Sequence, residues 1–185
     1  MILAWRGLIG AALVATALAA LPGCAGVPSV ANNDRNDSVS GRLSVRIASE
    51  PERGLNAGFE LIGTALEGRL LLSGPLGTTA AQARWSRGQA WLAVGGVETS
   101  YADLDLLTFA ALGERIPMAA LFDWLRGRPW SGAPAAARSD GMPGFDQLGW
   151  QVGLARWPEG WVEAYRPAKL SHPAVTVRVR LEPAA

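Results

Sequence analysis

The stretch VTVRVRL, residues 175–181, alternates apolar and polar side chains without a break. A period of two places Val175, Val177, Val179 and Leu181 on one face of a β-strand, and the polar residues between them on the other. One face of this strand is therefore expected to be buried and the other exposed to water. Antiparallel sheets with one covered face show this pattern.

The same alternation recurs along the chain. It is clear in GRLSVRI (41–47) and LNAGFEL (55–61), and short turns containing glycine separate further apolar segments. These segments lie at residues 67–72, 80–85, 90–94, 97–101, 147–154 and 161–165. Short strands joined by tight turns favour an antiparallel meander. A sheet of about ten to eleven strands is near the size at which it must curl or close.

Two short helices interrupt this pattern. Asp103 is suited to cap a helix that ends before Gly113, and Pro117 is suited to begin a second one that ends at Gly127. Trp124 and Leu125 lie on the apolar face of the second helix. A curled sheet needs its concave apolar face covered, and these helices are the segments available to cover it. The fold class is therefore α+β and mostly β.

The N-terminus has the features of a secretory signal. Arg6 precedes an apolar segment that is too short for a stable membrane span, and LPGC (21–24) resembles a bacterial lipobox, although Pro22 departs from its usual pattern. We expect residues 1–23 to be a signal peptide, residues 24–39 a lipidated flexible tether, and residues 40–185 a single domain. Cys24, the only cysteine, is the predicted lipidation site. The residue after this cysteine is Ala25. In enterobacterial lipoproteins an aspartate at this position resembles a signal for retention in the inner membrane, so its absence here favours the outer membrane.

The composition argues against several functional classes. The chain has 17 basic and 16 acidic residues and no basic stripe in its sequence, so nucleic-acid binding is not expected. His172 is the only histidine, and there is no nucleophile motif, P-loop or dinucleotide fingerprint. We therefore expect no enzyme activity, cofactor or metal. The tryptophans and leucines favour either a filled core or an apolar ligand cavity.

Five stretches together resemble the LolB family of outer-membrane lipoprotein receptors. They are GRLSVR (41–46), SGPLGTTAA (73–81), LGERIPMAALFDWLRGRP (112–129), FDQLGWQV (145–152) and AYRPAKLSH followed by VTVRVRL (164–181). They span almost the whole expected domain. The chain lacks an aromatic pair near residues 59–61 and a final tryptophan, both common in the family. The resemblance implies a half-open antiparallel β-barrel with a helical lid over an apolar cavity.

The resemblance also implies a function. A LolB-like receptor accepts lipoproteins from the periplasmic carrier LolA, holds their acyl chains and inserts them into the outer membrane. It would be a monomer anchored by lipid to the periplasmic leaflet, with outer-membrane lipid as a further partner. The turn at Pro75, Leu76 and Gly77 would be its membrane-insertion loop. The expected cavity lining is Leu43, Val45, Phe59, Leu61, Leu70, Leu72, Trp85, Trp91, Leu107, Leu121, Trp124 and Leu125.

The residues also permit two other functions. The barrel would suit another apolar ligand, such as a fatty acid or a phospholipid. Alternatively, the protein would be a structural envelope lipoprotein with a filled core. An enzyme is the weakest reading.

Overall fold

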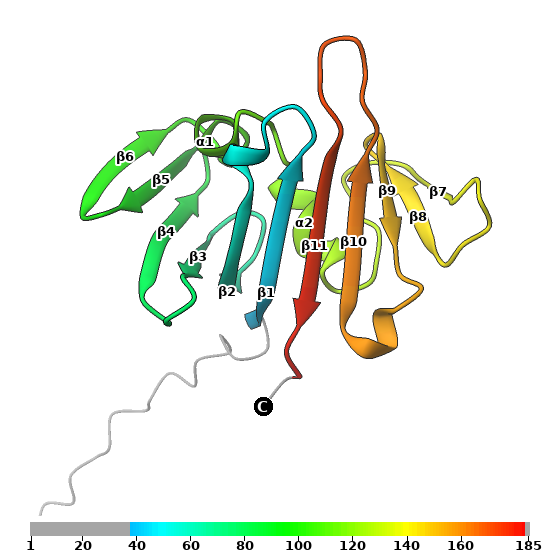
Figure 1. Ribbon diagram of the computed structural model, residues 1–185, viewed down its shortest axis with the longest axis horizontal. Coiled ribbons are helices and arrows are strands. Elements are labelled where there is room, and N and C mark those ends of the chain that lie inside the picture. Colours follow the sequence, from blue (N-terminus) through cyan, green and yellow to red (C-terminus); the bar gives the residue numbers. More distant parts are fainter. Residues whose placement is uncertain (1–37, 184–185) are drawn as a thin grey trace, which may run out of the picture. The chain divides into compact units, whose positions relative to one another are not determined.

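The computed structural model describes residues 38–183, which form one antiparallel sheet of eleven strands (Figure 1). The strands follow the order β6-β5-β4-β3-β2-β1-β11-β10-β9-β8-β7 across the sheet. Their bounds are β1 (Ser38–Ile47), β2 (Leu55–Gly63), β3 (Gly68–Ser73), β4 (Thr79–Ser86), β5 (Gln89–Val94), β6 (Val97–Tyr101), β7 (Ala135–Ala137), β8 (Gly144–Gln147), β9 (Trp150–Gly153), β10 (Trp161–Arg166) and β11 (Val175–Leu181).

The centre of the sheet is the pairing of β1 with β11, which joins the two ends of the domain. Leu43 lies opposite Val179, and Val45 lies opposite Val177, so the apolar faces of both strands match as the alternation predicts. β1 begins at Ser38, two residues before the expected start of the domain. The predicted antiparallel fold is confirmed, and the sheet stays open, with β6 and β7 as its edges.

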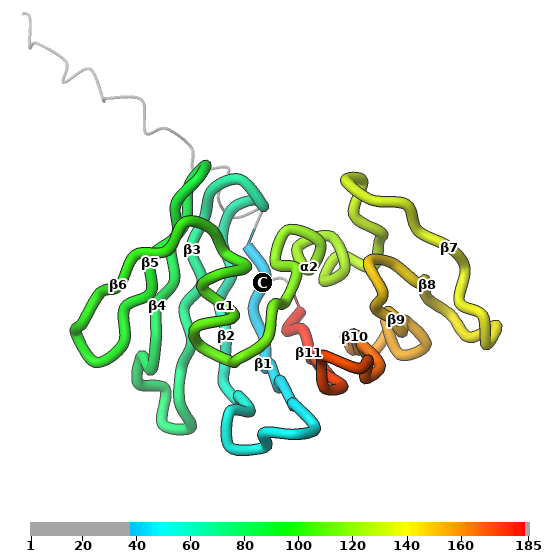
Figure 2. The backbone as a smooth tube through the Cα atoms, turned by 90° about the horizontal axis from the view of Figure 1, so that it is seen from above, coloured from blue at the N-terminus to red at the C-terminus, as the bar shows by residue number. Residues whose placement is uncertain are grey.

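Two α-helices lie on the concave side of the curved sheet (Figure 2). α1 (Leu104–Leu112) begins as predicted, because the Asp103 carboxylate accepts a hydrogen bond of 2.7 Å from the Leu106 amide. It ends at Gly113, which adopts a φ of 78°. α2 (Met118–Trp124) follows Pro117. Short 3-10 turns occupy Pro51–Arg53 and Trp157–Glu159.

The segment 147–154, predicted as one strand, is instead part of a hairpin. β8 ends at Gln147, and Leu148 and Gly149, both with positive φ, turn the chain into β9. The prediction missed this turn because its first residue is leucine, which rarely adopts a φ of 54°. It also missed β7, because three consecutive alanines carry no alternating pattern.

Candidate functional site

An apolar hollow of about 110 Å³ lies between the helices and the part of the sheet formed by β1–β5 and β11. The sheet supplies leucines, valines, Phe59 and Trp85, and the helices with the loop between them cover these residues. The full lining is Leu43, Val45, Leu55, Phe59, Leu61, Leu70, Leu72, Ala83, Trp85, Leu92, Leu104, Leu107, Thr108, Ala111, Leu112, Ile116, Met118, Leu121, Leu125, Val177 and Val179.

The polar groups of two lining residues are hydrogen-bonded within the protein. The Thr108 hydroxyl donates to the Asp105 carbonyl at 3.0 Å and accepts from the Ile116 amide at 3.1 Å. The Trp85 indole N–H donates to the Thr64 carbonyl at 3.0 Å. A side chain whose polar group is already paired adds little cost to an apolar ligand beside it. The hollow is therefore suited to hydrocarbon.

Ten of the twelve predicted lining residues border this hollow, and Trp91 is one of the two exceptions. Trp91 lies on the opposite face of β5, where the Arg84 guanidinium stacks over its ring at 4.3 Å. Its neighbours Ala90 and Leu92 face the concave side instead. The prediction for Trp91 is wrong by one residue of register, because a shift of one residue moves a side chain to the other face of the sheet.

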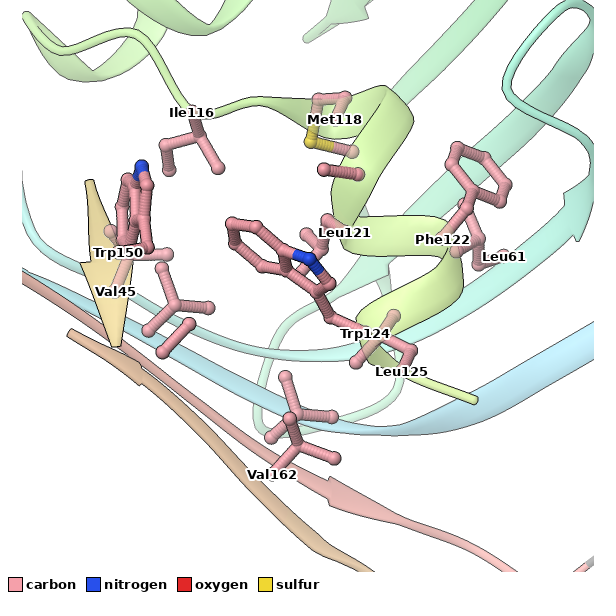
Figure 3. Packing of buried hydrophobic residues seen from close by; sticks show 14 of the residues in the cluster. Val45, Leu61, Ile116, Met118, Leu121, Phe122, Trp124, Leu125, Trp150 and Val162 are labelled. Carbon is pink, nitrogen blue, oxygen red and sulfur yellow. The ribbon is translucent and has the colours of Figure 1, made fainter. Parts of the chain in front are cut away.

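Trp124 is the second exception, although its side chain is fully buried. It projects from α2 toward Trp150, with ring centroids 5.9 Å apart, whereas Phe122 lies on the side of Leu61 (Figure 3). Trp124 therefore packs the part of the sheet formed by β8–β10, away from the hollow. Helical spacing predicts its burial, but it cannot tell which of two neighbouring regions the residue fills.

Gln147 organises the region around Trp124. It lies in the stretch FDQLGWQV (145–152), but nothing in the sequence indicates which groups its side chain bonds. Its Oε1 accepts hydrogen bonds from the Trp124 indole at 2.8 Å and from the Trp130 amide at 2.9 Å. Its Nε2 donates to the carbonyls of Trp130 and Ala133, at 2.7 and 2.8 Å. We call Trp124, Trp130, Gln147 and Trp150 the tryptophan–glutamine cluster. With every polar group of the Gln147 amide paired, this cluster is a fixed part of the core.

An ion pair joins the loop between the helices to the sheet. Glu114 and Arg166, with side chains 10% and 15% exposed, lie 2.5 Å apart. Arg166 also donates to the Arg115 carbonyl at 3.4 Å, and His172 lies 3.9 Å from the Glu114 carboxylate. The α1–α2 loop is thus fastened to the end of β10.

α1 is the less firmly seated of the two helices. Leu104 and Leu107 face the hollow, whereas Phe109 is 51% exposed. In the first turn of α1, partial burial, together with the nearby charge of Asp103, raises the pKa of the Asp105 carboxyl above its usual range. The carboxyl groups of Asp103 and Asp105 at the start of α1 and the exposed ring of Phe109 indicate that α1 lies at the rim of the domain.

The turn between β3 and β4 holds Leu76 away from the domain. The Gly77 amide donates to the Gly74 carbonyl at 3.0 Å, and Gly77 has a φ of 75°, which favours glycine. Leu76 is 91% exposed. Its side chain therefore does not fold back onto the hairpin. Cys24, the predicted lipidation site, lies outside the described residues.

Similarity to known proteins identifies the family. The family model described as "Outer membrane lipoprotein LolB" matches residues 36–182. This chain belongs to the LolB family. It is 33% identical to the outer-membrane lipoprotein LolB of Bordetella petrii over 165 residues, covering 84% of this chain and 82% of that protein. It is 34% identical to the LolB of Bordetella pertussis over 149 residues, 76% and 75% of the two chains.

A third LolB, from Ralstonia nicotianae, is 30% identical over 164 residues, which cover 82% of this chain and 78% of that protein. The resemblance read from the five sequence stretches is confirmed. LolB is a family of outer-membrane lipoproteins, which agrees with the prediction that this protein is an outer-membrane lipoprotein. Among the described residues, no helix is long and apolar enough to cross a membrane, and no cluster of three or more potential metal ligands occurs.

Proposed function

We propose that this protein is an outer-membrane-anchored receptor that accepts lipoproteins from the periplasmic carrier LolA and inserts them into the outer membrane. The observation that carries this proposal is the apolar hollow beneath the helices. In this account residues 1–23 are removed, Cys24 carries the acyl anchor, and residues 25–37 tether a monomeric domain to the periplasmic leaflet. The receptor role belongs to lipoprotein trafficking and requires no catalysis.

The energetics of the cargo explain why a hollow is needed. Each CH₂ group moved out of water contributes roughly 0.8 kcal/mol, so a lipoprotein with three acyl chains would have to overcome tens of kcal/mol to cross water unaided. A protein that shields the chains throughout removes this barrier. Transfer then requires only that the receptor holds the chains somewhat better than the carrier does.

The size of the hollow implies that it opens when it binds cargo. At about 110 Å³ it is smaller than an engineered cavity of about 150 Å³ that binds benzene, so it does not hold an acyl chain as it stands. α1 is the element best placed to move, because it lies at the rim with Phe109 exposed. Outward movement of α1 would join the hollow to the concave face of the open sheet.

Leu76 is suited to the last step. An exposed leucine gains free energy when it enters the acyl region of a bilayer, and the tight turn holds it ready at little conformational cost. We propose that the Leu76 turn, with Pro75 and Gly77 setting its shape, enters the membrane while the cargo leaves the hollow.

The direct test uses the mature lipidated protein in vesicles, mixed with a purified complex of LolA and a lipoprotein. We expect the lipoprotein to leave the carrier and become resistant to extraction from the vesicles. Vesicles without the receptor are the control. If the lipoprotein stays on the carrier while a fatty acid or phospholipid binds the hollow, the protein is a carrier of that other ligand.

A further inference from the structure

We propose that Arg42 and Arg180 form a site for the phosphate group of anionic phospholipids, which seats the Leu76 turn on the membrane. This inference rests on the insertion role proposed above and adds a lipid class to it. The two arginines lie far apart in the chain, but the register of β1 and β11 places them directly opposite each other. Both are exposed on the face of the sheet opposite the helices.

Two carboxylates, those of Glu159 and Glu182, line the same surface hollow as the two arginines, but neither forms an ion pair with them. Among the described residues, neither Arg42 nor Arg180 lies within ion-pair distance of an acidic side chain. Both carboxylates have other partners, because Glu159 pairs with Arg156 at 2.5 Å and Glu182 accepts a hydrogen bond from Ser40 at 3.3 Å. The hydrogen bond from Arg156 and the charges of Arg156 and Arg180 lower the pKa of the Glu159 carboxyl, so Arg180 is only partly neutralised. Like charges directly opposite on neighbouring strands repel each other. An anion bound between them would relieve this repulsion.

Guanidinium groups are well suited to that anion. Their N–H donors form a planar fork that matches two phosphate oxygens, and two such groups can share one phosphate. Arg180 also lies over the ring of Trp161, at 5.8 Å from its centroid. Stacking on a ring fixes the guanidinium plane and leaves the N–H groups at its edge available.

The position of the pair indicates a lipid rather than a soluble anion. Arg42 lines a second surface hollow with Pro75 and Gly77, the residues on either side of Leu76, and Glu182 also borders it. The β3–β4 turn, the start of β1 and the end of β11 lie at the same end of the sheet (Figure 1). The segment that leads to Cys24 joins the domain there, at Ser38. When Leu76 enters the acyl region, Arg42 and Arg180 therefore lie near the headgroups.

The test follows a dye attached at position 76 in the mature lipidated protein. Acylation of Cys24 leaves the Leu76→Cys thiol as the only one available for labelling. The protein is placed in vesicles of phosphatidylcholine alone or mixed with phosphatidylglycerol, and the emission shift reports burial of the dye. We expect anionic lipid to favour the buried state. Adding Arg42→Gln and Arg180→Gln should lower the ratio of buried to unburied dye about 25-fold in the anionic vesicles, about fivefold per arginine.

The matched control is Arg46→Gln with Arg87→Gln, which removes the same charge from exposed positions away from the turn. We expect it to retain most of the anionic-lipid response. An equal loss in both double variants, or none in the Arg42/Arg180 variant, contradicts the inference. The inference is also contradicted if the Arg42/Arg180 variant slows only the release of lipoprotein from the carrier, because the arginines would then contact the carrier protein and not lipid.

The outcomes also separate this inference from the proposed function. Dye that is buried equally in neutral and anionic vesicles contradicts the phosphate site and leaves the insertion role standing. Dye that stays in water on every vesicle contradicts both.

Discussion

The two halves of the concave face are built differently, although one continuous sheet forms both. The half over β8–β10 is filled by the tryptophan–glutamine cluster, in which large rings pack together and every polar group of Gln147 is hydrogen-bonded. The half over β1–β5 is lined by leucines and valines around the apolar hollow. The first half is fixed, and the second has room to change.

This difference supports the proposed function, because a receptor for acyl chains needs both properties. Leucine side chains repack around a flexible ligand at low cost, whereas a hydrogen-bonded tryptophan cluster does not. Because the cluster anchors α2, the movement proposed above would fall on α1 and its connections. The contrast predicts that substitutions in one half change stability, and that substitutions in the other change uptake of cargo.

Truncating Trp124 should have the largest effect on stability. Trp124→Ala empties the packed half and leaves Gln147 without one of its donors, so we expect the free energy of unfolding to fall by about 3–5 kcal/mol. Denaturant unfolding measures this. The matched control is Trp91→Ala on the outer face, which should cost no more than about 1 kcal/mol. Equal losses for the two tryptophans would show that the packed half contributes no more stability than a side chain on the outer face.

Removing the charge of Glu114 should have an intermediate effect. Glu114→Gln leaves the largely buried Arg166 without its carboxylate, and we expect a loss of about 1–3 kcal/mol. The loop between the helices would then be held less firmly, so an apolar dye should enter the hollow faster. Glu98→Gln, which breaks the exposed pair with Arg84, is the control and should leave the melting temperature unchanged. Unchanged dye entry would show that this ion pair does not restrain the helices.

Changing Leu76 should have the smallest effect on stability and a specific effect on function. Leu76→Glu alters a side chain that contacts little of the domain, so the melting temperature should not change. Uptake of lipoprotein from the carrier should persist, but delivery into vesicles should fail, because a carboxylate does not enter the acyl region. Leu66→Glu, another exposed leucine, is the control. Normal delivery by the Leu76 variant would contradict the insertion role.

Alternation predicted the strands of the sheet centre, because burial on one face leaves a period of two in the sequence. It did not predict the β8–β9 turn, where Leu148 adopts a left-handed conformation, or β7, whose three alanines show no period. Trp91 was placed on the wrong face because β5 is apolar at five consecutive positions, so no alternation fixes its register.

Gln147 and the Arg42–Arg180 pair were not predicted because both depend on contacts between distant segments. The Gln147 side-chain amide forms hydrogen bonds with Trp124 in α2 and with Trp130 and Ala133 in the loop that follows α2. A single glutamine in the sequence gives no sign of these partners. The arginines alternate with valine and leucine, so no basic run is visible until β1 and β11 pair. The role of the Leu76 turn was expected from the family resemblance. The glycines and proline around Leu76 indicate a tight turn but do not show which way its side chain points.

The central claim is that the hollow itself receives acyl chains, and two adjacent residues of β3 test it most directly. Leu70 lines the hollow, whereas Leu71 does not and alternates to the opposite face. Transfer of lipoprotein from the carrier is measured for Leu70→Trp and Leu71→Trp. If the hollow binds the chains, Leu70→Trp should weaken uptake about tenfold, the equivalent of roughly two methylene groups left unburied, and Leu71→Trp should not. Equal uptake by the two variants would place the acyl chains elsewhere on the protein.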